Sequence, residues 1–244
     1  MKTKLWKFLI TLMVILPLAL VSCHDDYMIG IRGQGEIEEE TISVDDFDGF
    51  LSAISADIFL KQGDRQEVVI EAQQNIIDNI DLDRIDNGIW TIRYHQMVRY
   101  AKPVKIYITI PTLTKAGISG SGEITGLTPF TGLDRLRLLV SGSGSIDLET
   151  ESTEVDAAIS GSGDLRMAGK TGEFSLLVSG SGSFHGSDLV TTSADLTLSG
   201  SGSARLTVEE FLHVMVSGSG YVYYYGDPDV DAHVSGSGRV IRGQ

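Results

Sequence analysis

Residues 155–165 read VDAAISGSGDL, and the SGSG run inside this stretch decides the fold. The run occurs seven times between residues 119 and 238, and successive copies start 18–22 residues apart. The copies start at Ser119, Ser141, Ser160, Ser179, Ser199, Ser217 and Ser235. A repeat period of this length is typical of proteins in which each unit forms one structural layer.

The flanks of the SGSG runs alternate between apolar and polar positions, as β-strands with one buried face do. The residue directly before each run is aliphatic: Ile118, Val140, Ile159, Val178, Leu198, Val216 and Val234. The second residue after each run is also apolar: Ile124, Ile146, Leu165, Phe184, Ala204, Val222 and Val240. A flexible glycine-serine linker would carry no such columns. Each SGSG run separates these two apolar columns, and we predict that it forms a corner between two strands.

Such a corner needs glycine, because other residues adopt the required backbone angles only with strain. Serine is small enough to stack on its copy in the next coil, and we expect its hydroxyl to bond along the stack. One unit of 18–22 residues cannot close a core alone, whereas stacked units bury a continuous one. The sequence therefore predicts an all-β, single-stranded, right-handed parallel β-helix, or solenoid, with residues 115–244 as its regular part.

Residues 31–114 are predicted to form an irregular N-terminal β part of the same solenoid, with a separate small β-domain as the alternative. Alternation over residues 104–110 indicates a strand, and the sequence DNG at residues 86–88 indicates a turn. Residues 32–37 resemble a degenerate SGSG coil, and residues 75–85 are compatible with one short helical turn.

The first 22 residues are predicted to be a lipoprotein signal peptide. A basic head with three lysines precedes an apolar run, residues 8–20, which is too short to span a bilayer. The run ends in LVSC, which resembles a lipobox, so Cys23 is the expected lipidation site and residues 23–30 form a tether. Acyl chains on Cys23 would anchor the protein to a membrane, and we expect an outer-membrane position. The alternative is an ordinary signal peptide that leaves Cys23 as a free thiol.

The charge balance excludes nucleic acid as a general partner. The chain carries 19 basic and 33 acidic side chains, and loss of the three leader lysines leaves 16 basic ones, a net charge of −17 (16 − 33). A strongly acidic protein repels the phosphate backbone of nucleic acids. Because Cys23 is the only cysteine, an intramolecular disulfide framework is excluded as well.

Four stretches carry a resemblance to a known family: FDGF at residues 47–50, LKQG at residues 60–63, VKIYITIP at residues 104–111 and ISGSGEI at residues 118–124. With them the chain resembles the putative auto-transporter adhesins with a head GIN domain. The resemblance covers most of the chain after the leader and implies a β-helical fold and an exported location. It implies no ligand and no functional residues.

One outward column of the predicted coils is the candidate ligand face. It takes one residue from each successive coil and consists of Arg166, His185, Arg205 and Tyr223, with Asp147 in the coil before them. Such a column would suit an acidic glycan. The alternative is an ordinary solvated face, because a solenoid must cover its outside with polar residues.

No catalytic or metal-binding pattern is recognised in the sequence. Only two of the seven positions that carry aspartate in calcium-binding rolls are acidic here. The five histidines are scattered without metal-ligand spacing, and neither a carboxylate pair nor a nucleophile with its base is identified. We therefore predict no catalysis, no cofactor and no metal. The tyrosines at positions 221 and 223–225 are expected to cap the C-terminal end rather than to stack on sugars.

These observations favour an exported, lipid-anchored, adhesin-like or scaffolding protein without catalysis. Its expected partners are a membrane, through Cys23, and a glycan or a surface protein. The alternative is a glycan-binding or polysaccharide-cleaving β-helix enzyme that uses an outer face of the solenoid. Homo-oligomerisation is left open by the sequence.

Overall fold

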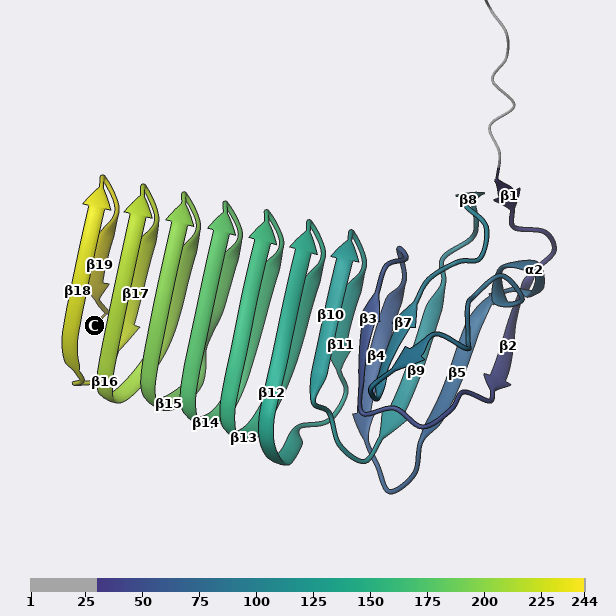
Figure 1. Cartoon of the computed structure of the whole chain (residues 1–244), viewed down its shortest axis with the longest axis horizontal. Coiled ribbons are helices and arrows are strands. Elements are labelled where there is room, and N and C mark those ends of the chain that lie inside the picture. The colour runs from purple at the N-terminus through teal and green to yellow at the C-terminus, as the bar shows by residue number, and fades with distance from the viewer. Residues whose placement is uncertain (1–29, 244) are drawn as a thin grey trace, which may run out of the picture.

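A computed structural model describes residues 30–243, so the predicted signal peptide, Cys23 and nearly all of the tether lie outside the described residues. Within these limits the chain is a β-solenoid whose coils lie side by side along one axis (Figure 1). One 17-stranded sheet winds through nearly all of it, and a two-stranded sheet joins β1 to β8. The predicted all-β solenoid is confirmed.

The elements of the described residues follow in chain order: β1 (Ile31–Arg32), β2 (Ile37–Ile42), β3 (Gly49–Ser52), β4 (Asp57–Gln62), β5 (Glu67–Gln73), α2 (Gln74–Ile77), β6 (Ile85–Asp86), β7 (Ile89–Ile92), β8 (Val98–Tyr100), β9 (Lys105–Ile110), β10 (Lys115–Gly120), β11 (Glu123–Gly126), β12 (Phe130–Gly142), β13 (Ser145–Gly161), β14 (Asp164–Gly180), β15 (Ser183–Gly200), β16 (Ser203–Gly218), β17 (Tyr221–Tyr225), β18 (Asp229–Gly236) and β19 (Arg239–Arg242).

Each SGSG run turns the chain at one edge of the stack (Figure 1). The first glycine of every run has a φ between 107° and 123°, a region in which other residues are strained. Backbone groups link successive corners: the Ser162 N–H donates to the Gly142 carbonyl (2.9 Å) and the Asp164 N–H donates to the Gly144 carbonyl (3.1 Å). The predicted corner is confirmed. In the described corners, however, these backbone bonds and not serine hydroxyls connect the coils.

The corners divide the outside of the solenoid into two faces. We call the segments that run into a corner ascending and those that follow a corner descending, and we name the two outer surfaces the ascending face and the descending face. A long strand such as β13 begins as a descending segment, bends, and ends as the ascending segment of the next corner. Parallel pairing then stacks each corner serine and glycine in register on its copies in the neighbouring coils.

The predicted inward columns form the core between the two faces. The residues directly before the corners, from Ile118 to Val216, are buried. The second residues after the corners, from Ile124 to Val222, are buried equally well, and apolar burial of this kind is the main stabilising contribution to a fold. In the last coil Val234 is 44% exposed, because no further described coil covers it.

The N-terminal coils do not stack in chain order. The coil of β3 and β4 is the first in the chain, yet it lies between the coil of β7 and β9 and the coil of β10 and β11. After β4 the chain moves outward through β5, which pairs antiparallel with both β9 and β2. The chain then returns past its first coil to begin β10. The hydrogen-bonded ladder thus continues without a break from residues 49–62 into the SGSG coils.

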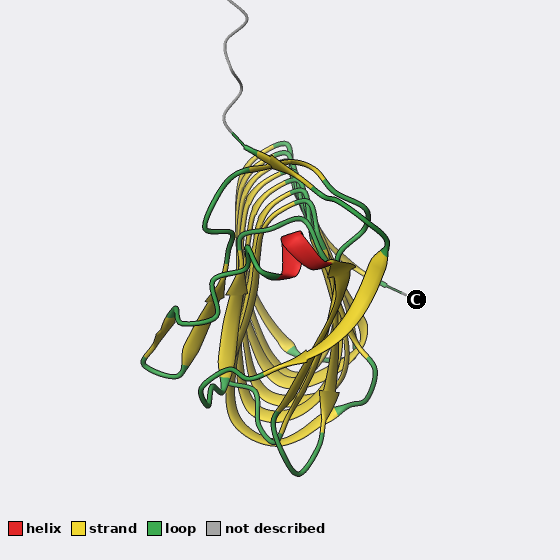
Figure 2. Ribbon diagram, turned by 90° about the vertical axis from the view of Figure 1, so that its right-hand side faces the viewer, coloured by secondary structure: helices red, strands yellow, loops and turns green. Residues whose placement is uncertain are grey.

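Local elements cover the N-terminal end of the stack. Helix α2 lies over the opening between the two faces (Figure 2), and its Ile76 and Ile77 are buried. Asn87 and Gly88 both have positive φ, as the turn between antiparallel β6 and β7 requires, so the predicted turn and the predicted helical turn are confirmed. The interpretation of residues 32–37 as a degenerate coil is wrong, because the strand that follows them runs antiparallel to its neighbour.

The C-terminal end has no comparable cover within the described part of the chain. β18 pairs only with β16, and β19 pairs only with β17, which leaves their outer edges free. The tyrosines of β17 belong to the penultimate coil, since β19 lies outside them. Their expected role as a cap of the C-terminal end is therefore wrong.

Candidate functional site

The four predicted ligand residues form one ladder on the descending face. Strand register places Arg166 beside His185, His185 beside Arg205, and Arg205 beside Tyr223. Asp147 precedes them in the same row. Neighbouring members are separated by one coil, about 4.8 Å, and each is at least partly exposed. We call these five residues the descending ladder.

Charged and aromatic contacts hold the side chains of the descending ladder in place. Arg166 Nη1 lies 3.2 Å from Asp147 Oδ2, and His185 Nε2 lies 3.9 Å from an oxygen of Asp164. The guanidinium of Arg205 lies 5.4 Å from the centre of the Tyr223 ring, in a cation–π arrangement. Exposed ion pairs of this kind contribute little to stability, so the same groups remain open to a ligand.

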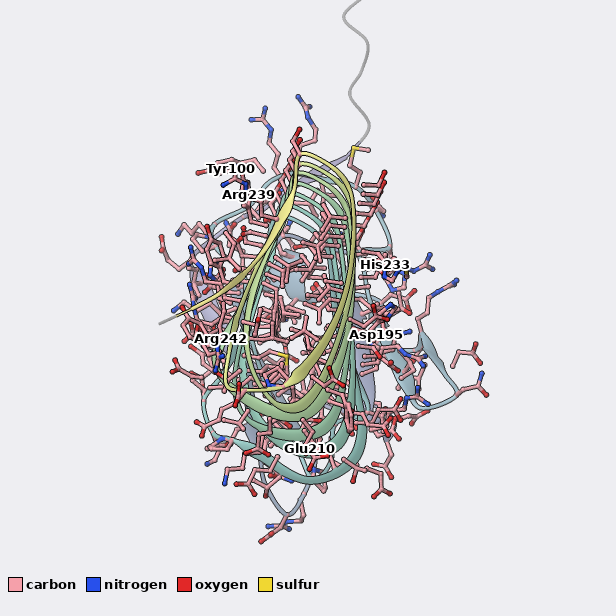
Figure 3. The ribbon with its side chains drawn as sticks, turned by 90° about the vertical axis from the view of Figure 1, so that its left-hand side faces the viewer. Tyr100, Asp195, Glu210, His233, Arg239 and Arg242 are labelled. Carbon is pink, nitrogen blue, oxygen red and sulfur yellow. The ribbon has the colours of Figure 1, made fainter. Side chains whose placement is uncertain are left out.

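A second group of chemically active side chains lies on the ascending face, in the last two coils. His213 pairs in register with Asp231, and His233 follows two residues later on the same strand. We call His213, Asp231 and His233 the histidine cluster. Viewed onto the C-terminal end of the stack, the labelled Asp195 and His233 lie on the same side of the solenoid (Figure 3).

Asp195 supports the histidine cluster from the next coil inward. Its Oδ2 lies 2.9 Å from His213 Nδ1, and His233 Nδ1 lies 3.4 Å from Asp231 Oδ1. The hydrogen bond to Asp195 raises the pKa of His213; desolvation opposes this increase, and the charges of Asp195 and Asp231 add to it. An acidic hollow of about 400 Å³ lies beside the cluster, lined by Asp195, His213 and Asp231 among others.

The histidine cluster is not visible in the sequence at the short histidine spacings of local metal motifs. In a solenoid the relevant spacing is the length of one coil, and His213 and His233 are about one coil apart in the chain. His213 and Asp231 belong to one outward column, and His233 belongs to the next outward column of the same face. A comparison of these two adjacent columns would bring the three residues together.

A comparison with known families identifies the solenoid. The family model described as "Putative auto-transporter adhesin, head GIN domain" matches residues 46–228, about three quarters of the chain. The chain belongs to this family. The match runs from the segment before β3 to the end of β17, so the head GIN domain includes both the irregular N-terminal coils and most of the SGSG coils. The resemblance expected from the sequence is confirmed.

Solved structures share the head GIN fold over nearly the whole described chain. A putative adhesin from Bacteroides fragilis is 21% identical, with a TM-score of 0.80 over 87% of this chain and 100% of its own. A putative lipid binding protein from Parabacteroides distasonis is 22% identical, with a TM-score of 0.73 over 88% and 99%. A putative adhesin from Parabacteroides merdae is 18% identical, with a TM-score of 0.71 over 88% and 100%. At these identities the likeness shows the fold.

Two further observations concern the head GIN domain protein. No curated protein matches the chain. Within residues 30–243, no helix is both long and apolar enough to cross a membrane. The family and the two adhesin-like neighbours are described as adhesins and not as enzymes.

Proposed function

We propose that the protein is a lipid-anchored, adhesin-like surface protein that binds an extended partner along the descending ladder and catalyses no reaction. Membership of the head GIN adhesin family carries this proposal. The anchor is Cys23, in the lipobox-like LVSC at the end of the leader. The partner that the ladder fits best is an acidic glycan.

The position of β1 agrees with an N-terminal anchor. β1 lies at the N-terminal end of the solenoid, and the last coil of β18 and β19 lies at the opposite end (Figure 1). A lipid on Cys23 would therefore hold the N-terminal end at the membrane and leave the SGSG coils reaching away from it. Such an arrangement suits a protein that displays a long surface to large partners.

The chemistry of the descending ladder favours a glycan. Arg166 and Arg205 lie two coils apart, about 9.6 Å at the interstrand spacing, and each can bind a carboxylate or sulfate with two parallel hydrogen bonds. Tyr223 lies beneath the Arg205 guanidinium and adds a ring surface of the kind that packs on sugars. In a chain of net charge −14, a row with two exposed arginines is a local exception.

The geometry does not favour cleavage of the bound glycan. An enzyme of that kind needs an acid and a base or nucleophile that face one enclosed space. The acidic groups are Asp147 in the ladder and Asp164 beside it, which lie on an open surface and are already engaged by Arg166 and His185. We therefore assign the ladder to binding and not to catalysis.

The anchor is tested by replacing Cys23 with alanine. Loss of the acyl chains should release the protein from the membrane fraction or leave an unprocessed precursor, because no other lipid site is proposed. Metabolic labelling with palmitate and fractionation of cells measure both effects, and protease treatment of intact cells reports surface exposure. Normal labelling and membrane partitioning of Cys23→Ala would contradict the anchor.

The ladder is tested by the double substitution Arg166→Ala and Arg205→Ala. Binding to an acidic polysaccharide such as heparin should fall at least about tenfold, because two charge-assisted contacts are lost. Lys170→Ala is the matched control, since it removes a positive charge from β14 outside the ladder. Surface plasmon resonance at fixed salt compares the three proteins. Equal losses in the ladder variant and the control would indicate nonspecific charge attraction and reject the site.

A further inference from the structure

The histidine cluster has the donor set of a transition-metal site. His213, Asp231 and His233 each offer one ligand atom, and these atoms all lie within 4.8 Å of one another. The three residues are fixed on two hydrogen-bonded strands, β16 and β18, and share the ascending face. Three converging protein ligands with an open side toward solvent are the arrangement found in zinc sites that keep a position for water.

The two imidazoles select the class of ion. Calcium and magnesium prefer oxygen ligands, whereas zinc, nickel and copper bind imidazole well. Ligand atoms around one tetrahedral ion are about 3.3 Å apart, given metal–nitrogen bonds of about 2.0–2.1 Å. Only a small closure of the cluster is needed, and the side chains of His233 and Asp231, 73% and 70% exposed, have room to rotate into place.

Asp195 completes the arrangement as a positioning residue. It lies one coil inward from His213 and bonds to Nδ1 of that ring. With Nδ1 carrying the proton in this hydrogen bond, Nε2 is the nitrogen that remains for a metal. A carboxylate behind a metal-binding histidine fixes the orientation of the ring and increases its basicity.

The surroundings of the histidine cluster favour a cation. The adjacent hollow is lined by four carboxylates, Glu173, Asp195, Asp229 and Asp231, and its described lining contains no lysine or arginine. Clustered charge of one sign concentrates ions of the opposite sign. The acidic lining is therefore a second observation in favour of a cation, separate from the distances between the ligand atoms of the cluster.

From the donor set, the support from Asp195 and the acidic surroundings, we infer that the histidine cluster binds one divalent transition-metal ion of the zinc type. The site lies on the ascending face at the C-terminal end, on the opposite face from the descending ladder. It is therefore distinct from the glycan site of the proposed function. Neither site depends on the other.

Calorimetric titration with zinc chloride tests the inference on the full chain in detergent, free of any affinity tag. The wild type should bind one zinc ion per chain in a saturable manner. His233→Ala should weaken binding about 100-fold, and Asp195→Asn about tenfold, as is typical for loss of a supporting carboxylate. The side chain of His233 lies exposed in the last coil, so its removal should leave folding unchanged.

His185→Ala is the matched control, because His185 also faces a carboxylate, Asp164, but lies on the descending face. Its zinc affinity should equal that of the wild type. Titration with cobalt adds a spectroscopic readout, since cobalt in a site with histidine ligands absorbs visible light. The inference is overturned if the wild type shows no saturable binding, if His233→Ala binds as tightly as the wild type, or if His185→Ala causes an equal loss.

Discussion

At the scale of single residues, the corner glycines are constrained by conformation and by space. Gly161 has a φ of 118°, and an ideal Cβ on it would lie 2.5 Å from the carbonyl oxygen of Gly142 in the neighbouring coil. No side chain fits at that distance without moving the backbone. The glycine is required because two coils approach each other through their main chains.

Replacing Gly161 with valine should therefore destabilise the protein by about 2–4 kcal/mol, the range expected for backbone strain combined with overpacking. Each coil supports its neighbours, so the loss should affect the whole unfolding transition. Denaturant and thermal unfolding measure it. Ser162→Ala, at the exposed next position, should unfold like the wild type. An unmoved transition in Gly161→Val would mean that the corner tolerates a side chain.

At this scale most of the fold could be predicted from the sequence. The inward columns and the corners follow from an apolar pattern that occurs seven times. Each occurrence supports the same interpretation of the strands and the corner. The descending ladder followed by the same reasoning, because residues one period apart must become neighbours. The histidine cluster could not be found in this way, since His213 and His233 stand in different columns and meet only diagonally.

At the scale of elements, a buried carboxylate ties the loop after α2 to the segment after β7. Asp81 is 6% exposed. Its Oδ2 lies 2.9 Å from both Nε and Nη2 of Arg93, and its carbonyl accepts a hydrogen bond from the Trp90 indole (3.1 Å). Burial would raise the pKa of Asp81, but the hydrogen bond and charge of Arg93 outweigh it and hold this pKa below its ordinary value.

Asp81→Asn should lower the free energy of unfolding at neutral pH by about 1.5–3 kcal/mol, the usual contribution of a hydrogen bond to a charged group. A carboxyl group whose pKa is depressed in the folded state stabilises the fold above its unfolded pKa and loses this effect as the pH falls toward the folded pKa. The difference between wild type and variant should therefore shrink between pH 5 and pH 3 or below.

Urea unfolding at pH 7 and at pH 3 measures this difference. Asp83→Asn is the control, because Asp83 is an exposed carboxylate in the same loop and its side chain should contribute little at either pH. Equal stability of Asp81→Asn and the wild type at pH 7 would show that the Arg93 pair has no net effect.

The elements of the N-terminal part could be predicted individually but not in their arrangement. The turn at Asn87 and Gly88 and the helical turn of α2 are encoded by neighbouring residues. The position of β3 and β4 between two coils that both come later in the chain is not, because strands with the same alternation fit either neighbour equally well. Pairing over such distances in the chain is decided by the complete packing, which local periodicity does not contain.

At the scale of the whole molecule, the SGSG coils are interchangeable units. Each contacts its two neighbours through the same register of corner serines and glycines. In a stack of this kind, stability is close to a sum of contributions from units and their interfaces. The number of coils is therefore not fixed by any long-range contact among them.

Deletion of residues 161–179 tests this independence, because it removes one full period and joins Ser160 to Gly180 in an intact SGSG run. The shortened chain should keep its β circular dichroism and melt cooperatively, with a melting temperature lower by a few degrees. Deletion of residues 161–170 is the control, since it removes one corner and the descending segment after it, which leaves the neighbouring descending segments without a partner, and it should unfold the stack. Loss of structure in both variants would contradict interchangeable coils.

The order of the N-terminal coils has a consequence for how the chain acquires its structure as it emerges with its N-terminus first. Residues 49–62 appear early, but one of their neighbours, β9, ends only at Ile110. β3 can pair with β7 once Ile92 has emerged, but until Ile110 has emerged β4 has no complete partner strand on either side. Once β7 and β9 are in place they supply a finished template, and every later coil can add to it in chain order as soon as it appears. The N-terminal part thus acts as the seed from which the rod grows in one direction.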